Sequence, residues 1–216
     1  MIEVQVREPL ARAFQRVPNG PGEPPGEDRL VLGGVSWEQY VAIDEERGAE
    51  HSQPRLYFLN EQLEVMTTSR RHERIKDWIT WLLLEFFNEA DLEVFTHGQA
   101  TLQEFGRAGA EPDGSWCLGA EKEIPDLVLE VALTSGGVDK LEIYRRFAVP
   151  EVWLWQNERL EIWTLRTDAG GYDGPARASR LLPALDLALL ERCVALSTWR
   201  EARRTFRDGI APPRPH

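Results

Sequence analysis

The chain has 216 residues, of which 42% are hydrophobic, and a formal net charge of -11. This length predicts one domain with an ordinary hydrophobic core, and no apolar run is long enough to cross a bilayer. The acidic charge weakens the case for a protein that holds nucleic acid over a broad basic face, although a local basic patch can exist on an acidic protein.

The two ends of the chain are rich in proline. Residues 1–30 hold five prolines with several glycines, and the last nine residues hold three more prolines. We therefore expect a flexible segment at 1–30, one domain at 31–207 and a flexible tail at 208–216. Met1 is not followed by a signal-peptide pattern, and Cys117 and Cys193 form no ligand-spaced cluster, so we expect a cytoplasmic protein without a cysteine zinc site.

The first half of the domain reads as a short helix, a hairpin and a long helix. Ser36 is a typical N-cap for the short helix, and Ser69 is one for the long helix, which extends to about Asn88. Apolar residues recur along the long helix at the spacing of a buried stripe. The hairpin joins 56–59 to 63–66.

The second half alternates strands with helices. Strands are expected at 93–96, 100–105 and 115–118, and the apolar run 127–133 is typical of a central strand covered on both faces. A helix at 141–148, a hairpin joining 152–155 to 160–165, and one closing helix at 185–204 follow. This order predicts an α/β fold with a mixed sheet packed by helices.

Two acidic residues are candidates for a chemical site. Asp113 lies in Pro-Asp-Gly, where an aspartate commonly bonds its own turn, so a purely structural role is an open alternative. Glu130 interrupts the apolar run, and burying an unpaired charge costs several kcal/mol. Glu130 must therefore be paired, protonated or bound to a cation, and the structural alternative is an ion pair with an arginine. Strand alternation places Asp126 on the same face as Glu130, unless Asp126 lies solvated at the strand entrance.

Three further side chains are candidates on helices. Lys140 shares a stripe with Tyr144 and Phe147, which suggests an inward lysine, although a lysine near a helix end also snorkels to solvent. At 100° per residue, His72 falls on the buried stripe of the long helix and Glu73 falls at its rim. A satisfied core histidine is the structural alternative for His72. The basic residues 70, 71, 74 and 76 are placed to meet phosphates or to form a solvated face.

Taken together, five segments resemble one known family. They are 66–76, 111–113, 125–131, 139–144 and 149–153. This order resembles the Uma-two family of restriction endonucleases, within the PD-(D/E)XK nuclease superfamily, and the likeness extends from about residue 36 to 187.

The resemblance implies a restriction-endonuclease-like core, a central mixed sheet flanked by helices, with a Mg²⁺ (or Mn²⁺) site at one sheet edge. It implies that Asp113 and Glu130 are the metal-binding acids, and that His72 or Glu73 completes the site. The superfamily lysine usually follows the second acid by two residues, where this chain has Ala132, so Lys140 is the substitute candidate.

The expected reaction is phosphodiester hydrolysis by a metal-dependent endonuclease. A divalent cation holds two nearby carboxylates ionised, activates water and stabilises charge on the phosphate. The expected partner is nucleic acid, DNA in the first place, with a homodimer as a candidate assembly and no membrane. The alternative is a decayed nuclease fold that acts as a binding or assembly module. The acidic charge, Ala132, and three tryptophans (153, 155 and 163) that would face a partner subunit favour this alternative.

Overall fold

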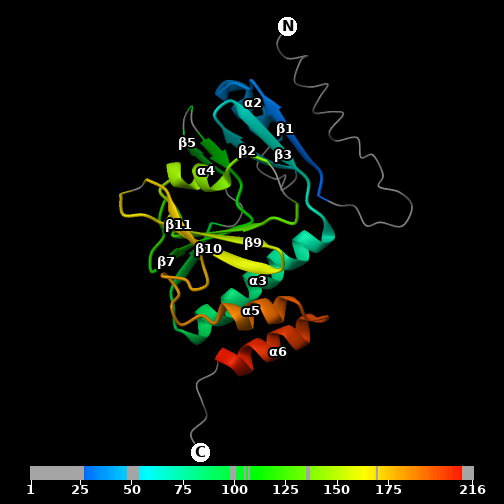
Figure 1. The fold of residues 1–216 in the computed structure, drawn as a ribbon, viewed down its shortest axis with the longest axis vertical. Helices are drawn as coiled ribbons and strands as arrows, with labels where there is room; N and C mark the ends of the chain where they lie inside the picture. Colours follow the sequence, from blue (N-terminus) through cyan, green and yellow to red (C-terminus); the bar gives the residue numbers. More distant parts are fainter. Residues whose placement is uncertain are drawn as a thin grey trace, which may run out of the picture.

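The structure is a computed structural model that describes residues 27–47, 54–97, 101–104, 106, 108–134, 137–168 and 170–210. Two β-sheets form its centre, with helices on the outer faces and one short helix between the sheets (Figure 1). The expected N-terminal segment and tail lie largely outside the described residues. The strand β1 starts at Arg29, just inside the expected N-terminal segment, and the last helix ends at Ile210.

The larger sheet has six strands in the order β11-β10-β9-β8-β7-β4. Neighbouring strands are antiparallel except β8 and β9, which are parallel, so the predicted mixed sheet is confirmed. Its central strand β8 is buried on both faces, as its apolar sequence predicts. The six strands are β4 (Val94–Thr96), β7 (Gly114–Leu118), β8 (Leu127–Val131), β9 (Glu151–Gln156), β10 (Arg159–Leu165) and β11 (Tyr172–Ala176).

The smaller sheet has five antiparallel strands in the order β1-β3-β2-β6-β5. Helix α2 (Trp37–Arg47) covers its outer face, where Tyr40 stacks on Phe58 at 5.1 Å and lies so close to Gly109 that a β-carbon there would collide with the ring. The strands are β1 (Arg29–Gly33), β2 (Arg55–Leu59), β3 (Gln62–Met66), β5 (Leu102–Glu104) and β6 (Ala108–Ala110).

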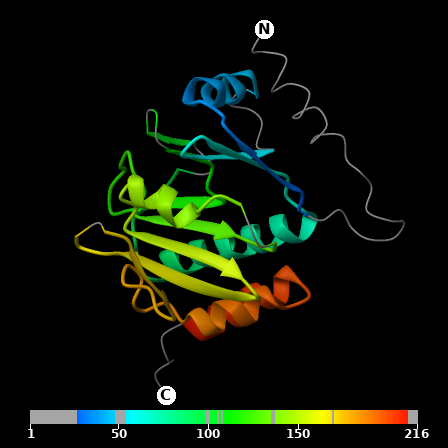
Figure 2. The ribbon, with the colours of Figure 1, turned by 45° about the horizontal axis from the view of Figure 1, so that its top comes forward.

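Three helices cover the outer face of the larger sheet, while α4 (Lys140–Arg146) packs on its inner face against β2 and β6 (Figure 2). The outer helices are α3 (Arg70–Glu89), α5 (Leu187–Val194) and α6 (Trp199–Ile210). The apolar stripe of α3 packs on alternate residues of β8, so Leu129 and Val131 face α3 while Val128 faces α4. Because Glu130 also alternates to the inner face, its carboxylate lies between the two sheets.

Two expectations are wrong. The single closing helix is two helices, because α5 ends at Val194 and the Thr198 side chain caps α6 by accepting from the amide of Glu201 at 3.3 Å. The three tryptophans considered for a partner interface belong instead to covered sheet faces: Trp153 and Trp155 are 0% and 3% exposed under the outer helices, and Trp163 is partly buried on the inner face. None of the described helices is long and apolar enough to cross a membrane.

Candidate active site

Asp113 lies immediately before β7 and its side chain is fully buried. Its Oδ2 accepts a hydrogen bond from the β8 amide of Val131 at 2.6 Å and lies 3.2 Å from Nε2 of His72, while Oδ1 lies 2.9 Å from Nη2 of Arg55. Burial raises the pKa of Asp113, but Arg55 and His72 outweigh burial and hold it below its usual range. The alternative of a self-bonded turn aspartate is therefore wrong, since Asp113 bonds a distant strand.

Glu130, in the middle of β8, is 0% exposed and has a donor on each oxygen. Tyr144 donates to Oε1, Lys140 donates to Oε2 at 2.7 Å, and the hydroxyl of Tyr57 lies 3.0 Å from Oε2. Burial raises the pKa of Glu130 and nearby Asp113 adds to this, while Lys140 opposes it. The expected partner for a structural ion pair was an arginine, and the observed partner is a lysine.

Lys140 is the first residue of α4, and its side chain is 11% exposed. Its Nζ lies 3.8 Å from the centroid of the Tyr57 ring, which adds a cation–π contact to the Glu130 pair. The loop before α4 is held by Glu64, whose carboxylate accepts from the amide of Val138 at 2.7 Å. Gly137 has a φ of +99°, and a β-carbon there would collide with Glu64, so glycine permits this close approach. Lys140 thus points inward, as its stripe predicts.

Arg55 is a residue of this site that the sequence did not indicate. It begins β2, is 1% exposed, and bonds the carbonyls of Pro112 and Glu111 at 3.1 and 3.4 Å as well as pairing with Asp113. The only available signal was a charge beside the buried strand sequence Leu-Tyr-Phe-Leu. Arg55 fixes the segment that carries Asp113 against the smaller sheet.

His72 is fully buried and faces carboxylates on both ring nitrogens. Nε2 donates to the Val131 carbonyl at 3.1 Å beside Asp113, and Nδ1 lies 3.5 Å from Oε1 of Glu73. Burial lowers the pKa of His72, but the bonds to Asp113 and Glu73 outweigh burial and raise it to about 9. This raised pKa favours the protonated imidazole, in which both ring nitrogens are donors.

Glu73 lies at the rim, with its side chain 32% exposed, as the helical angle predicts. Thr68 donates to its Oε1 at 2.6 Å and Lys76 pairs with its Oε2. Burial raises the pKa of Glu73, but its bonds to His72, Lys76 and Thr68 outweigh that and hold it far below the usual range. The carboxylate stays charged at any ordinary pH.

Glu27 is a second residue that the sequence missed, because it lies in the proline-rich segment. Its side chain is 1% exposed and its Oε1 lies 3.8 Å from Nε2 of His72. Asp126, by contrast, lies at the strand entrance, where it accepts from the amide of Leu118 at 2.7 Å and pairs with Lys122 at 2.5 Å. Asp126 is therefore not part of this site.

Two buried carboxylate oxygens of the site have no hydrogen-bond donor among the described residues. They are Oδ1 of Asp113 and Oε1 of Glu27, although Arg55 lies within ion-pair distance of the first. Within that part of the chain no group of three or more acidic, histidine or cysteine side chains is arranged to hold a metal.

The sequence matches the model of one protein family over residues 37–199, and that family is described as "Uma2: Putative restriction endonuclease". The chain belongs to the Uma2 family. The Uma2 match confirms the resemblance and the restriction-endonuclease-like fold, and it indicates a nuclease. The matched range contains His72, Asp113, Glu130 and Lys140, whereas Glu27 and nearly all of α6 lie outside it. No curated protein matches the sequence.

Proposed function

We propose that this protein is a metal-dependent endonuclease that hydrolyses phosphodiester bonds in DNA. The observation that carries the proposal is the lysine that α4 delivers to Glu130, at 2.7 Å, beside the buried Asp113. The position two residues after Glu130 is occupied by Ala132, which carries no charge. The cation of the site is instead the ammonium group of Lys140 on α4. Two acids and one lysine thus meet between the sheets, although they come from three separate segments.

Asp113 and Glu130 would hold a divalent cation, Mg²⁺ or Mn²⁺, through their carboxylate oxygens. When bound, such an ion supplies Lewis-acid stabilisation of a phosphate and a lowered pKa for water. Arg55 and His72 keep Asp113 ionised and fix its orientation through the contacts described above. The raised pKa of Glu130 makes a counter-cation necessary if this carboxylate is to stay charged.

Lys140 stabilises negative charge that develops on the phosphate. Its Nζ is held by Glu130 and by the Tyr57 ring, so it is oriented before substrate arrives. Tyr57 and Tyr144 keep their protons, because burial raises the pKa of each phenol well above its ordinary value. Both therefore act as donors that position Glu130. Glu73 and Lys140 are the partly exposed members of the site, and substrate would approach from them.

The proposal is tested by cleavage of plasmid DNA and of single-stranded oligonucleotides with Mg²⁺ or Mn²⁺, comparing the wild type with Glu130→Gln. We expect cleavage by the wild type only when a divalent ion is present, and a loss on the order of 100-fold or more in the variant. Glu161→Gln, a change of the same kind on β10, should cut normally. A folded Glu130→Gln protein that cuts at the wild-type rate would refute the assignment.

The second candidate function is a binding or assembly module on a decayed nuclease fold. It is favoured by Glu130, whose two oxygens already have donors, and by the lack of a three-ligand cluster among the described residues. A thermal-unfolding measurement with and without Mn²⁺ separates the two, because an ion that binds the native state must raise the melting temperature. Sedimentation analysis of the same samples tests the proposed homodimer.

A further inference from the structure

Two hollows lie along the outer side of α3, and they meet at a cluster of tryptophans. The first, of about 520 Å³, surrounds the start of α3, and the second, of about 650 Å³, lies between the end of α3 and α6. Trp199 contacts Trp78 and Trp81 across the junction, at ring distances of 6.0 and 5.0 Å. We call this surface the α3–α6 groove. Its lining residues are Thr68, Ser69, Arg70, Glu73, Arg74, Asp77, Trp78 and Trp81 in the first hollow, and Glu89, Trp199, Arg200, Arg203, Arg204, Arg207 and Asp208 in the second.

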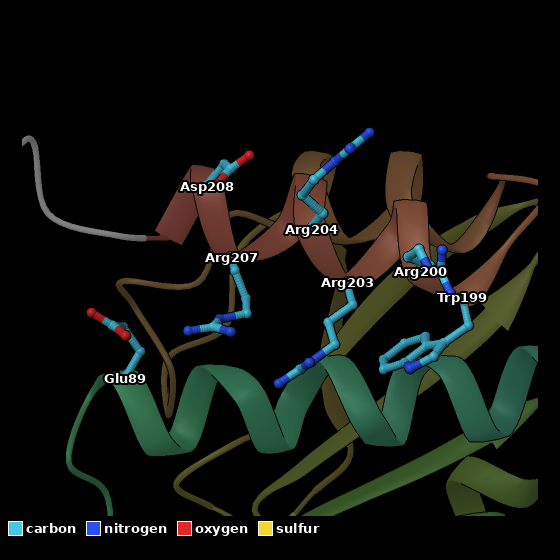
Figure 3. Close-up of a pocket in the computed structure, with 7 residues that line it drawn as sticks. All are labelled: Glu89, Trp199, Arg200, Arg203, Arg204, Arg207 and Asp208. Atoms are coloured by element: carbon cyan, nitrogen blue, oxygen red, sulfur yellow. The ribbon is translucent and has the colours of Figure 1, made fainter.

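Arginines gather in this groove although the protein is acidic overall. Figure 3 shows Arg203 and Arg207 reaching from α6 toward α3, where both lie near Glu85, at 2.5 and 3.5 Å. These two arginines fasten α6 to α3. Arg204 points away from α3 in the same view, and it is exposed, as is Arg200.

Four of the six arginines in the groove have no carboxylate partner among the described residues. They are Arg70, Arg74, Arg200 and Arg204. A charge that is neither buried nor paired adds little to stability, so its placement in a hollow needs another explanation. An anion with several regularly spaced charges, such as a nucleic-acid backbone, would complement this row.

The tryptophans offer a second and different contact. Trp81 is 42% exposed, unlike the buried Trp78, over which Arg74 lies at 5.8 Å from the ring centroid. Partly exposed aromatic rings beside basic side chains are the arrangement by which proteins stack an unpaired base while holding its phosphates. A base inside a duplex cannot present its face in this way.

The groove also leads to the candidate active site. Glu73 lines the first hollow and contacts His72 and Thr68 of the buried site. From Glu73, α3 continues for another 16 residues, about 24 Å, past Trp81 to the α6 arginines. A strand lying in the groove would therefore have one end beside the proposed cleavage centre.

We propose that the α3–α6 groove binds single-stranded nucleic acid, with a base stacked on Trp81 and phosphates held by Arg70, Arg74, Arg200 and Arg204. This inference rests on the proposed nuclease function and specifies its substrate as a single strand. The part of the groove on α3 lies within the range matched by the family, and nearly all of the part on α6 lies beyond it.

The test measures binding by fluorescence anisotropy in EDTA, so that binding is separated from cleavage. The probe is a labelled single strand of about 15 nucleotides, compared with its duplex over a range of salt concentrations. We compare Arg200→Gln/Arg204→Gln with Arg145→Gln/Arg166→Gln as the control pair, since Arg145 lies on α4 and Arg166 follows β10. Trp81→Ala is compared with Trp81→Phe, which keeps an aromatic face.

We expect the wild type to bind the single strand more tightly than the duplex. The α6 double variant should bind more weakly, with a salt slope shallower by about 1.4 for two lost phosphate contacts. Trp81→Ala should lose affinity on the order of tenfold, and Trp81→Phe should recover most of it. The control pair should bind as the wild type does.

Three results would refute the groove proposal. The wild type could bind the duplex as tightly as the single strand, or the control pair could lose as much affinity as the groove variants. Poly-glutamate at matched charge concentration could also displace the strand, which would mean that the groove accepts any acidic chain. Cleavage measured on the same variants keeps the two proposals apart. If Glu130→Gln loses cleavage while the groove variants cleave and bind as the wild type does, only the groove proposal is refuted. If the wild type binds the single strand but does not cleave it, only the nuclease proposal is refuted.

Discussion

The two charged regions of this protein differ in how their charges are satisfied. In the buried site each ionic side chain has a partner of opposite charge within hydrogen-bond or ion-pair distance, as Arg55 has Asp113 and Lys140 has Glu130. In the α3–α6 groove, Arg200 and Arg204 are exposed and have no carboxylate partner among the described residues. The charges of the buried site therefore contribute to stability and to the proposed reaction, whereas the exposed charges of the α3–α6 groove are available to a ligand. Substitutions should therefore affect the two regions very differently.

The largest effect is expected for Asp113→Ala. This change removes the nearest carboxylate from the buried guanidinium of Arg55 and leaves Glu73 at 3.9 Å, which costs about 3–5 kcal/mol of unfolding free energy. Urea unfolding measures the loss. The double variant Arg55→Met/Asp113→Ala should be more stable than Asp113→Ala alone, because no charge is then stranded. A loss below about 1 kcal/mol in the single variant would mean that the pair is solvated.

A smaller effect on stability, with a large one on activity, is expected for Lys140→Met. The carboxyl of Glu130, whose pKa burial already raises, would take up a proton when the lysine is removed, so the fold survives. Cleavage should fall on the order of 100-fold, because a charge-stabilising donor is lost. Steady-state cleavage rates and circular dichroism on the same protein check this. Unchanged cleavage would remove Lys140 from the mechanism and leave it as a structural partner of Glu130.

A moderate effect is expected from pH, measured without divalent ions. The pKa of His72 is raised from 6.5 to about 9 in the folded state, so the folded protein holds this proton more tightly than the unfolded chain does. The stability that His72 contributes is complete below pH 6.5 and is lost as pH rises through about 9. Unfolding free energies between pH 6 and 10 should show this decline, and His72→Gln should flatten it. An equal slope in the variant would assign the decline to another group.

The smallest effect is expected for Arg203→Gln in the groove. Its ion pair with Glu85 joins side chains that are 48% and 23% exposed, so solvent screens the pair and its loss costs less than about 1 kcal/mol. Thermal unfolding with Arg145→Gln as the matched change measures it. A loss above about 2 kcal/mol would show that this pair, unlike an ordinary surface pair, holds α6 in place.

Local sequence signals predicted much of the fold. The apolar stripe of α3 and the two-sided apolar run of β8 each follow from a repeating pattern, and the same patterns placed His72, Glu130 and Lys140 inward. β1, β6 and β11 carry no such repeat and were missed, as was the assembly of the predicted strands β2, β3 and β5 into a second sheet. Arg55 was missed for a different reason, since its partner Asp113 is distant in the chain and only sheet stacking brings them together. The split between α5 and α6 was missed because continuous helical spacing outweighed a capping Thr198.

The contact between Glu64 and the amide of Val138 links the smaller sheet to the start of α4. Glu64 sits on β3, whose neighbour β1 supplies Arg29 at 3.3 Å from the same carboxylate. The loop that Glu64 holds sets where α4 begins, and hence where Lys140 stands. A lysine carried on β8 would be aligned by the pairing of that strand alone. Because Lys140 lies on α4, the position of its side chain depends instead on how the two sheets are placed relative to each other. A substitution at the edge of the smaller sheet can therefore change the activity of the site on the larger sheet.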